Sequence, residues 1–267
     1  MSNIISKLNF ILLQSGKIHF WPSLAILTLT TVFFRNFLFT SQAPAGIDAK
    51  GFISRPWYLL QNGEIWSLWH SQFSFGFIRL PTVDTALAIL YSIVNDPVLG
   101  LKIFAIGAFI LSAASMYFVT FKYTGRKLSA GVSAVVFSSN QFLFSYYTSG
   151  VYNVIAAYCI SPIIFYTFER MITNRTWRST TLFSISFSVL CMFTRVDMAT
   201  FFAPFLIFLL VCNFVSSGND ETKLEWLKTN FRICLTASIM IIGLTSFLWL
   251  PMVMGARLPL PTSSGGF

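Results

Sequence analysis

The sharpest candidate for a catalytic residue is an aspartate that directly follows the first long apolar run. Asp48 stands in the segment Ala45-Gly-Ile-Asp48. A carboxylate that aromatic neighbours partly desolvate can take a proton from a hydroxyl, so Asp48 is a candidate general base. The alternative is an aspartate that caps a helix or shapes a turn.

A second charged position, Arg195 with Asp197, interrupts the apolar stretch from Thr180 to Val215. The interruption predicts a tight outer turn between two membrane passes. A guanidinium group there suits a phosphate, which it holds by paired hydrogen bonds. The alternative is a structural salt bridge from Arg195 to Asp197 or to Asp48.

The segment from about 40 to 97 collects ionisable residues and tryptophans that the rest of the chain lacks. Arg55 and His70 are its candidate substrate-binding residues, and Trp57, Trp66 and Trp69 lie near them in the sequence. Polar groups with interfacial tryptophans are typical of an outer vestibule at the level of the lipid headgroups. The alternative is a solvated loop whose tryptophans only anchor it.

Several motifs that carry metal or cofactor chemistry do not occur in the sequence. It contains no DxD pair, no HExxH, no GxSxG and no Walker loop. The two histidines, His19 and His70, are far apart, and no CxxC accompanies the four cysteines. We therefore expect no cofactor, with a divalent metal left open but supported by no DxD motif, and free cysteines that behave as buried apolar residues.

The composition is that of a membrane protein. Of the 267 residues, 55% are hydrophobic and 10% are charged, and the mean hydropathy is +0.70. A soluble domain has about a quarter of its residues charged. The net charge of +9 comes from short basic clusters between apolar runs. This pattern is typical of the loops that orient a membrane protein, rather than of a nucleic-acid-binding surface.

Long apolar runs predict an all-α bundle of about seven membrane-spanning helices in a single domain over 1–267, each crossing needing about 20 residues. The expected spans are Phe20–Phe39, Val98–Phe121, Leu128–Tyr146, Val151–Phe168, Thr180–Thr194, Met198–Val215 and Ile233–Met254. The first favours a retained signal anchor over a cleaved signal peptide, and the polar tail after Leu258 leaves open that the chain is the N-terminal part of a longer protein.

The basic clusters indicate on which side of the membrane one further apolar segment lies. This segment, Ala86 to Val94, is too short to cross. If this segment stays outside, the clusters around Lys7, Lys122, Arg175 and Lys228 all fall on the cytoplasmic side. The N-terminus is then cytoplasmic. The predicted large outer loop, about 40–97, carries short membrane-parallel helices.

The loop that opens with Gly46-Ile-Asp48 and continues through Trp57-Tyr-Leu-Leu-Gln-Asn-Gly-Glu-Ile-Trp66, followed by six more spans, resembles the N-terminal module of GT-C-class membrane glycosyltransferases. It is also similar to prokaryotic membrane proteins built on that module. The resemblance implies a polyprenyl- or dolichyl-phosphate-linked sugar donor, Asp48 as the loop carboxylate, and Ala86–Val94 as a membrane-parallel helix. It departs from the class in having no second acidic motif, which favours metal-free, base-assisted transfer.

Two functions remain open at this stage. The first is a multi-pass glycosyltransferase of the cell membrane, whose partners are the lipid bilayer and a polyprenyl-phosphate-linked sugar. The second is a non-catalytic membrane subunit or carrier that binds lipid or other membrane subunits. Nucleic acid is not an expected partner of either.

Overall fold

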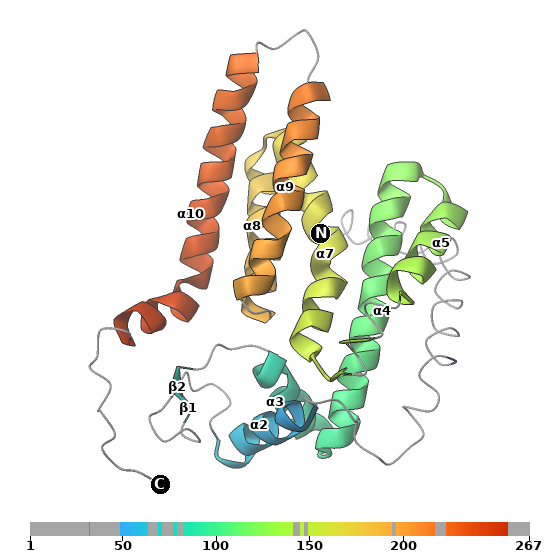
Figure 1. The fold of residues 1–267 in the computed structure, drawn as a ribbon, viewed down its shortest axis with the longest axis vertical. Helices are drawn as coiled ribbons and strands as arrows, with labels where there is room; N and C mark the ends of the chain where they lie inside the picture. The colour runs from blue at the N-terminus through green and yellow to red at the C-terminus, as the bar shows by residue number, and fades with distance from the viewer. Residues whose placement is uncertain are drawn as a thin grey trace, which may run out of the picture.

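The computed structural model describes residues 32, 49–63, 69–70, 77–78, 83–140, 145–146, 149–193, 196–216 and 223–255. This part of the chain forms eight α-helices and two strands of two residues each (Figure 1). The predicted all-α class is therefore confirmed for the described residues.

Two short helices, α2 (Ala49–Gln61) and α3 (Val83–Val94), lie together at the lower end of the molecule in Figure 1. Between them in the sequence, β1 (Trp69–His70) pairs antiparallel with β2 (Phe77–Ile78). With 12 residues, α3 is too short to cross a bilayer, which needs about 20. This agrees with the prediction that residues 86–94 do not span.

Each predicted span after the first overlaps a helix. These helices are α4 (Pro97–Thr124), α5 (Lys127–Ser138), α7 (Tyr152–Asn174), α8 (Trp177–Phe193), α9 (Val196–Ser216) and α10 (Lys223–Gly255). Three stretches within them are long and apolar enough to cross a membrane: 97–124, 152–174 and 223–246. The first predicted span, 20–39, lies outside the described residues except for Val32.

The prediction of one continuous helix over Leu128–Tyr146 is wrong, because α5 ends at Ser138. The side chains at the end of α5 bond back to its own carbonyls: Ser139 Oγ donates to Val135 O at 2.6 Å, and Asn140 Nδ2 donates to Phe137 O at 2.8 Å. Serine and threonine make the same bond inside α8 and α10, whereas Asn140 lies beyond α5 and donates to a carbonyl of its last turn. At 12 residues, α5 is shorter than a full crossing.

The connection from α3 to α4 is short because its residues suit helix ends. Asn95 adopts a left-handed conformation, with φ of 56°, and its N–H donates to Tyr91 O. Asp96 then caps α4 by accepting from the N–H groups of Val98 and Leu99, and Pro97 occupies the first helical turn. An aspartate cap before proline is a common helix start. It keeps α3 beside the first turns of α4.

Apolar side chains are exposed along the outward faces of the long helices. Phe208 of α9 is 65% exposed and Ile239 of α10 is 62% exposed. In α10 only 11% of the most apolar 18-residue window is buried, although its mean hydropathy is 1.3. Monomeric soluble proteins rarely expose contiguous apolar surface on this scale, whereas lipid accommodates it. Together with the three long apolar helices, this surface indicates a membrane protein.

The interior contains two apolar clusters joined by α7. The first lies where α2 and α3 meet α4 and the start of α7, and it includes Phe52, Tyr91 and Tyr152. The second lies farther along α7, where α8, α9 and α10 pack, and it includes Met171 and Leu190. α7 therefore ties the α2–α3 pair to the long helices.

Polar bonds between helices supplement this packing. Ser115 Oγ of α4 donates to Cys159 O of α7 at 2.8 Å. Ser184 Oγ of α8 donates to Thr180 O of its own helix at 2.9 Å and also approaches Ala237 O of α10 at 3.4 Å. Asn140, two residues beyond the end of α5, donates from its side-chain amide to the hydroxyl of Tyr158 on α7. Contacts of this kind are the usual polar links between membrane helices.

The four cysteines lie in four different helices, as expected. Cys159 is in α7, Cys191 in α8, Cys212 in α9 and Cys234 in α10, and all are free thiols. Cys159 is 4% exposed and packs as a small apolar residue, as expected. The expected burial is wrong for Cys212, which is exposed, and only partial for Cys191 and Cys234.

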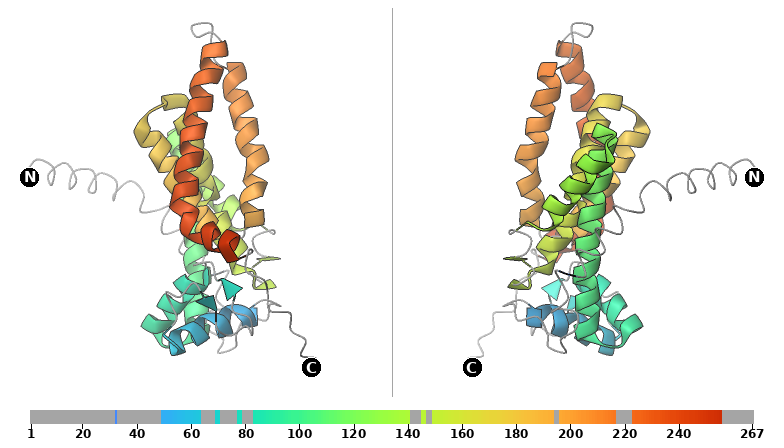
Figure 2. Two further views of the ribbon diagram at one scale, coloured as in Figure 1. Left: turned by 90° about the vertical axis from the view of Figure 1, so that its left-hand side faces the viewer. Right: turned by 90° about the vertical axis from the view of Figure 1, so that its right-hand side faces the viewer.

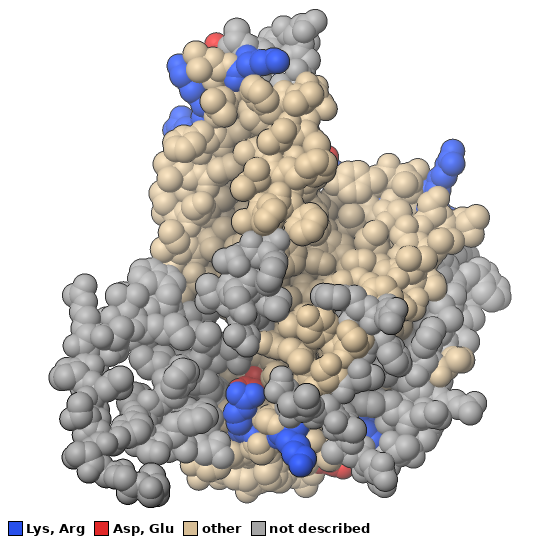
Figure 3. Space-filling view, in the orientation of Figure 1, with Lys and Arg blue, Asp and Glu red and all other residues tan. Residues whose placement is uncertain are grey.

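Three basic connections lie at the end of the bundle opposite α2 and α3. α4 rises from the α3 end to Thr124, α7 rises to Asn174, and α10 descends from Lys223 (Figures 1 and 2). The basic clusters 122–127, 170–178 and 223–232 lie at these helix ends, the last of them in the first turns of α10. Figure 3 shows Lys and Arg at the upper end of the molecule and again near its lower end, with a broad uncharged surface between them.

Candidate functional site

Most of the residues proposed for chemistry fall outside the described part of the chain. This holds for Asp48 and Arg195, and for the side chains of Asp197 in α9 and His70 in β1. Arg55 is described. What the structure shows of the candidate site is therefore its framework: α2, which follows Asp48 in the sequence, and the helices on which α2 rests.

The side chain of Arg55 contacts its own helix. Its Nε donates to Gly51 O at 3.3 Å, and its guanidinium carbon lies 5.4 Å from the centre of the Phe52 ring. Stacking on an aromatic face leaves the edge of a guanidinium group available for an anion. The half-buried Arg55 is thus held in place by α2.

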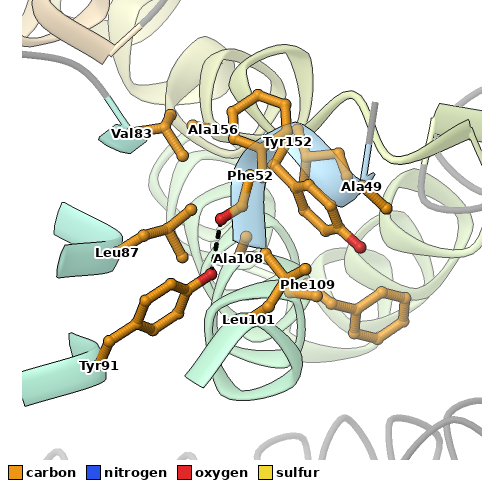
Figure 4. Close-up of a cluster of buried hydrophobic side chains, with 12 residues drawn as sticks. Ala49, Phe52, Val83, Leu87, Tyr91, Leu101, Ala108, Phe109, Tyr152 and Ala156 are labelled. Carbon is orange, nitrogen blue, oxygen red and sulfur yellow. Dashed lines mark hydrogen bonds between the residues drawn. The ribbon is translucent and has the colours of Figure 1, made fainter. Parts of the chain in front are cut away.

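Tyr91 fastens α2 and α3 to the start of α4 (Figure 4). Its hydroxyl donates to Phe52 O of α2 at 2.7 Å. Its ring lies against Gly100 of α4, where an added Cβ would stand 2.4 Å from ring atom Cδ1. Burial is the main reason that the pKa of Tyr91 is raised above its ordinary value, and the nearby Tyr152 and Asp84 raise it further. The hydroxyl therefore keeps its proton and remains a hydrogen-bond donor.

The first described residue of α2 meets the turn that precedes α7. Ala49 is fully buried, and a Cβ added to Gly150 would stand 2.6 Å from Ala49 N. Gly150 has a φ of +80°, a conformation that glycine adopts without strain. The residue after Asp48 is therefore locked against the backbone that begins α7.

Aromatic rings complete this junction. The rings of Phe52 and Tyr152 meet edge to face with centroids 5.4 Å apart, and Phe104 of α4 approaches Tyr152 at 6.4 Å. Figure 4 shows the Tyr152 hydroxyl beside Ala49. Edge-to-face pairs fix ring orientation as well as burying apolar area.

Two buried ionisable residues in α3 and at the start of α4 were not among the predicted site residues. Lys102 of α4 is 3% exposed and Asp84 of α3 is 7% exposed. Lys102 is the only charged residue from Val98 to Phe121, and an ionisable residue within an apolar run is a functional candidate by default. That rule, applied to Arg195, would also have found Lys102.

No group of three potential metal-ligating side chains occurs among the residues that the structure describes. No family model, curated protein or solved structure matches the chain. The case for a function therefore rests on the residues themselves, on the arrangement of the helices and on the resemblance of the loop around Asp48.

Proposed function

We propose that the chain crosses the membrane with its basic connections in the cytoplasm and the α2–α3 pair on the outer face. The observation that supports this is the placement of three basic turns at one end and α2 and α3 at the other. Cytoplasmic loops carry an excess of Lys and Arg. On this proposal the chain has seven spans, of which the first lies within residues 20–39. Because α4 ends and α7 begins at opposite ends of the bundle, the whole segment 127–151, of which α5 is only a part, makes one of these crossings.

We further propose that the protein is a membrane glycosyltransferase acting on the outer face, with Asp48, the residue before α2 in the sequence, as its general base. The donor is a sugar linked to a polyprenyl or dolichyl phosphate. The buried junction of α2, α3, α4 and α7 supports this, because a general base must be held on a rigid framework to reach its substrate. The short helices of the first outer loop also fit the GT-C-like layout.

The proposed reaction moves one glycosyl group. The bond between the sugar's anomeric carbon and the phosphate oxygen breaks, and its electron pair leaves with the lipid phosphate. A new bond forms from the anomeric carbon to the acceptor oxygen, and the Asp48 carboxylate takes the acceptor's proton. An oxocarbenium-like centre develops between these steps, as in glycoside hydrolysis. In this scheme Arg195, beside Asp197, binds the donor phosphate, and Arg55 and His70 contact the substrate.

Transfer from a polyprenyl-phosphate sugar donor in membranes tests this function. Asp48→Asn keeps the size of the side chain and removes the proton acceptor, so turnover should fall by about a hundredfold or more. Arg195→Ala should instead weaken donor binding, because the phosphate loses a charge-assisted hydrogen bond.

The matched control is Glu225→Gln, at the exposed start of α10 and at the opposite end of the bundle. It should transfer normally. Unchanged turnover in Asp48→Asn would reject the catalytic role of Asp48. No transfer by the wild type with any donor would leave the alternative, a non-catalytic subunit or carrier that binds lipid or a partner.

A further inference from the structure

Two cations lie on a pair of touching aromatic rings at the ends of α4 and α7 that are farthest from α2 and α3. The rings of Phe118 in α4 and Tyr166 in α7 meet edge to face, with centroids 5.7 Å apart. Lys122 Nζ lies 5.6 Å from the centre of the Phe118 ring. The guanidinium carbon of Arg170 lies 5.4 Å from the centre of the Tyr166 ring. Neighbouring rings therefore hold one positive charge from each helix.

Both cations lie at the same level of the bundle. α4 and α7 run in the same direction, away from the α2–α3 end (Figures 1 and 2). Lys122 and Arg170 each follow their ring by four residues in the sequence, which is about 6 Å along a helix axis. The two charges thus stand one turn beyond the contact between Phe118 and Tyr166.

One carboxylate borders this pair, and a tyrosine already bonds to it. Tyr123 Oη donates to Glu169 Oε2 at 2.5 Å, and the ring of Tyr123 meets that of Tyr166 edge to face at 5.9 Å. The two positive charges of Lys122 and Arg170 and the negative charge of Glu169 leave a net charge of +1. A ligand with one negative charge balances this group.

An exposed apolar face of α4 leads from these charges toward the middle of the helix. Phe118 is 45% exposed, and Leu111, seven residues earlier on the same face, is 48% exposed. Lys122 and Arg170 are exposed as well. α4 is long and apolar enough to cross a membrane, so this face suits acyl chains while the long basic side chains reach the headgroup layer.

We propose that Lys122 and Arg170 bind the phosphate of one anionic phospholipid, whose acyl chains lie along the exposed face of α4. Arginine and lysine make charge-assisted hydrogen bonds to phosphate oxygens, and the rings orient both cations in advance. A lipid with one negative charge neutralises the site, whereas a zwitterionic lipid does not. Basic pockets between transmembrane helices are known sites for such head groups. The site lies at the opposite end of the bundle from α2 and does not depend on sugar transfer.

Lipid titration of the purified, delipidated full chain in a neutral detergent, followed by native mass spectrometry, tests this site. The probes are a short-chain phosphatidylglycerol, a phosphatidylcholine with the same chains, and inorganic phosphate. The wild type should bind phosphatidylglycerol about tenfold or more tightly than phosphatidylcholine. Equal affinity for the two lipids would overturn the proposal. Inorganic phosphate that binds as tightly as phosphatidylglycerol would assign the site to a free ion and overturn the choice of a lipid.

Single substitutions locate the site. Lys122→Gln and Arg170→Gln should each weaken phosphatidylglycerol binding about tenfold, and Lys122→Arg, which keeps the charge, should retain it. The matched control is Lys228→Gln, which removes one exposed positive charge from α10 at the same end of the bundle. It should keep the wild-type affinity. Equal losses in all three glutamine variants would show a response to net charge alone and overturn the proposal. Without lipid, the variants should melt at the wild-type temperature, because the substituted side chains are exposed.

Discussion

The hydroxyl of Tyr91 stands 2.7 Å from the carbonyl oxygen of Phe52, and it replaces a hydrogen bond that α2 cannot make. In an α-helix the carbonyl of residue 52 would accept from the N–H of residue 56. That residue is Pro56, which has no N–H. Tyr91 of α3 thus supplies the missing donor, and a proline inside α2 becomes the point where α3 is attached.

Tyr91→Phe tests this replacement. The variant leaves a buried carbonyl without its donor, so the free energy of unfolding should fall by about 1–3 kcal/mol. Unfolding in detergent with rising denaturant, followed by circular dichroism, measures the change. A variant as stable as the wild type would show that the bond contributes nothing.

A double-mutant cycle with Pro56→Ala isolates the cause. Alanine restores the N–H at position 56, so Phe52 O regains an acceptor role within the helix. In this background Tyr91→Phe should cost distinctly less than it does alone, because the carbonyl keeps a partner. Equal costs in both backgrounds would contradict the link between Pro56 and Tyr91.

Gly100→Ala should disturb the same attachment from the side of α4. The new Cβ would stand 2.4 Å and 2.8 Å from ring atoms Cδ1 and Cε1 of Tyr91, and the buried ring has to move. Overpacking of this kind costs about 1–3 kcal/mol in the free energy of unfolding. Gly107→Ala is the matched control in the same helix, since nothing lies within 4 Å of its added Cβ. Equal stabilities of the two variants would refute the close contact.

Ser115→Ala should weaken the packing of α4 on α7. Ser115 Oγ lies 2.8 Å from Cys159 O of α7 and 2.9 Å from Ser112 O of its own helix, and its one proton is shared between them. Ser112 Oγ donates to Phe109 O within α4. Interhelical bonds in membrane proteins contribute about 0.6 kcal/mol on average. Ser115→Ala should therefore lower the free energy of unfolding by about that amount more than the control Ser112→Ala. A reversed order of the two variants would count against the bond.

Long apolar runs predicted the main helices well, because lipid requires their backbone bonds to be made within each segment. The predicted Val98–Phe121 lies inside α4, and the predicted Val151–Phe168 differs from α7 by one residue at its start. The end of α5 was missed because hydropathy averages over the polar residues Ser138, Ser139 and Asn140, which interrupt the apolar run from 128 to 146.

The framework of the candidate site was less predictable. Pro56 shows from the sequence alone that a carbonyl in α2 would lose its donor, but Tyr91, 39 positions beyond Phe52, is found only once α3 is folded beside α2. Lys102 was overlooked because one charge does little to the hydropathy of a long run. The junction of Gly150 with Ala49 likewise depends on a contact between segments about a hundred positions apart in the sequence.

The membrane orientation can be tested at the two ends of the α3–α4 unit. Asn62 and Thr124 are both exposed. If α3 does not span the membrane, α4 is the one crossing between them, and they lie on opposite sides. The variant Asn62→Cys should react with an impermeant thiol reagent added outside intact cells, and Thr124→Cys should react only after the membrane is opened. Asn62 is preferable to Gly63, whose φ of +69° strains any side chain. The wild type is the control, because its four cysteines lie within helices. Reaction of both variants from outside would mean that α3 crosses, and the seven-span arrangement would have to be abandoned.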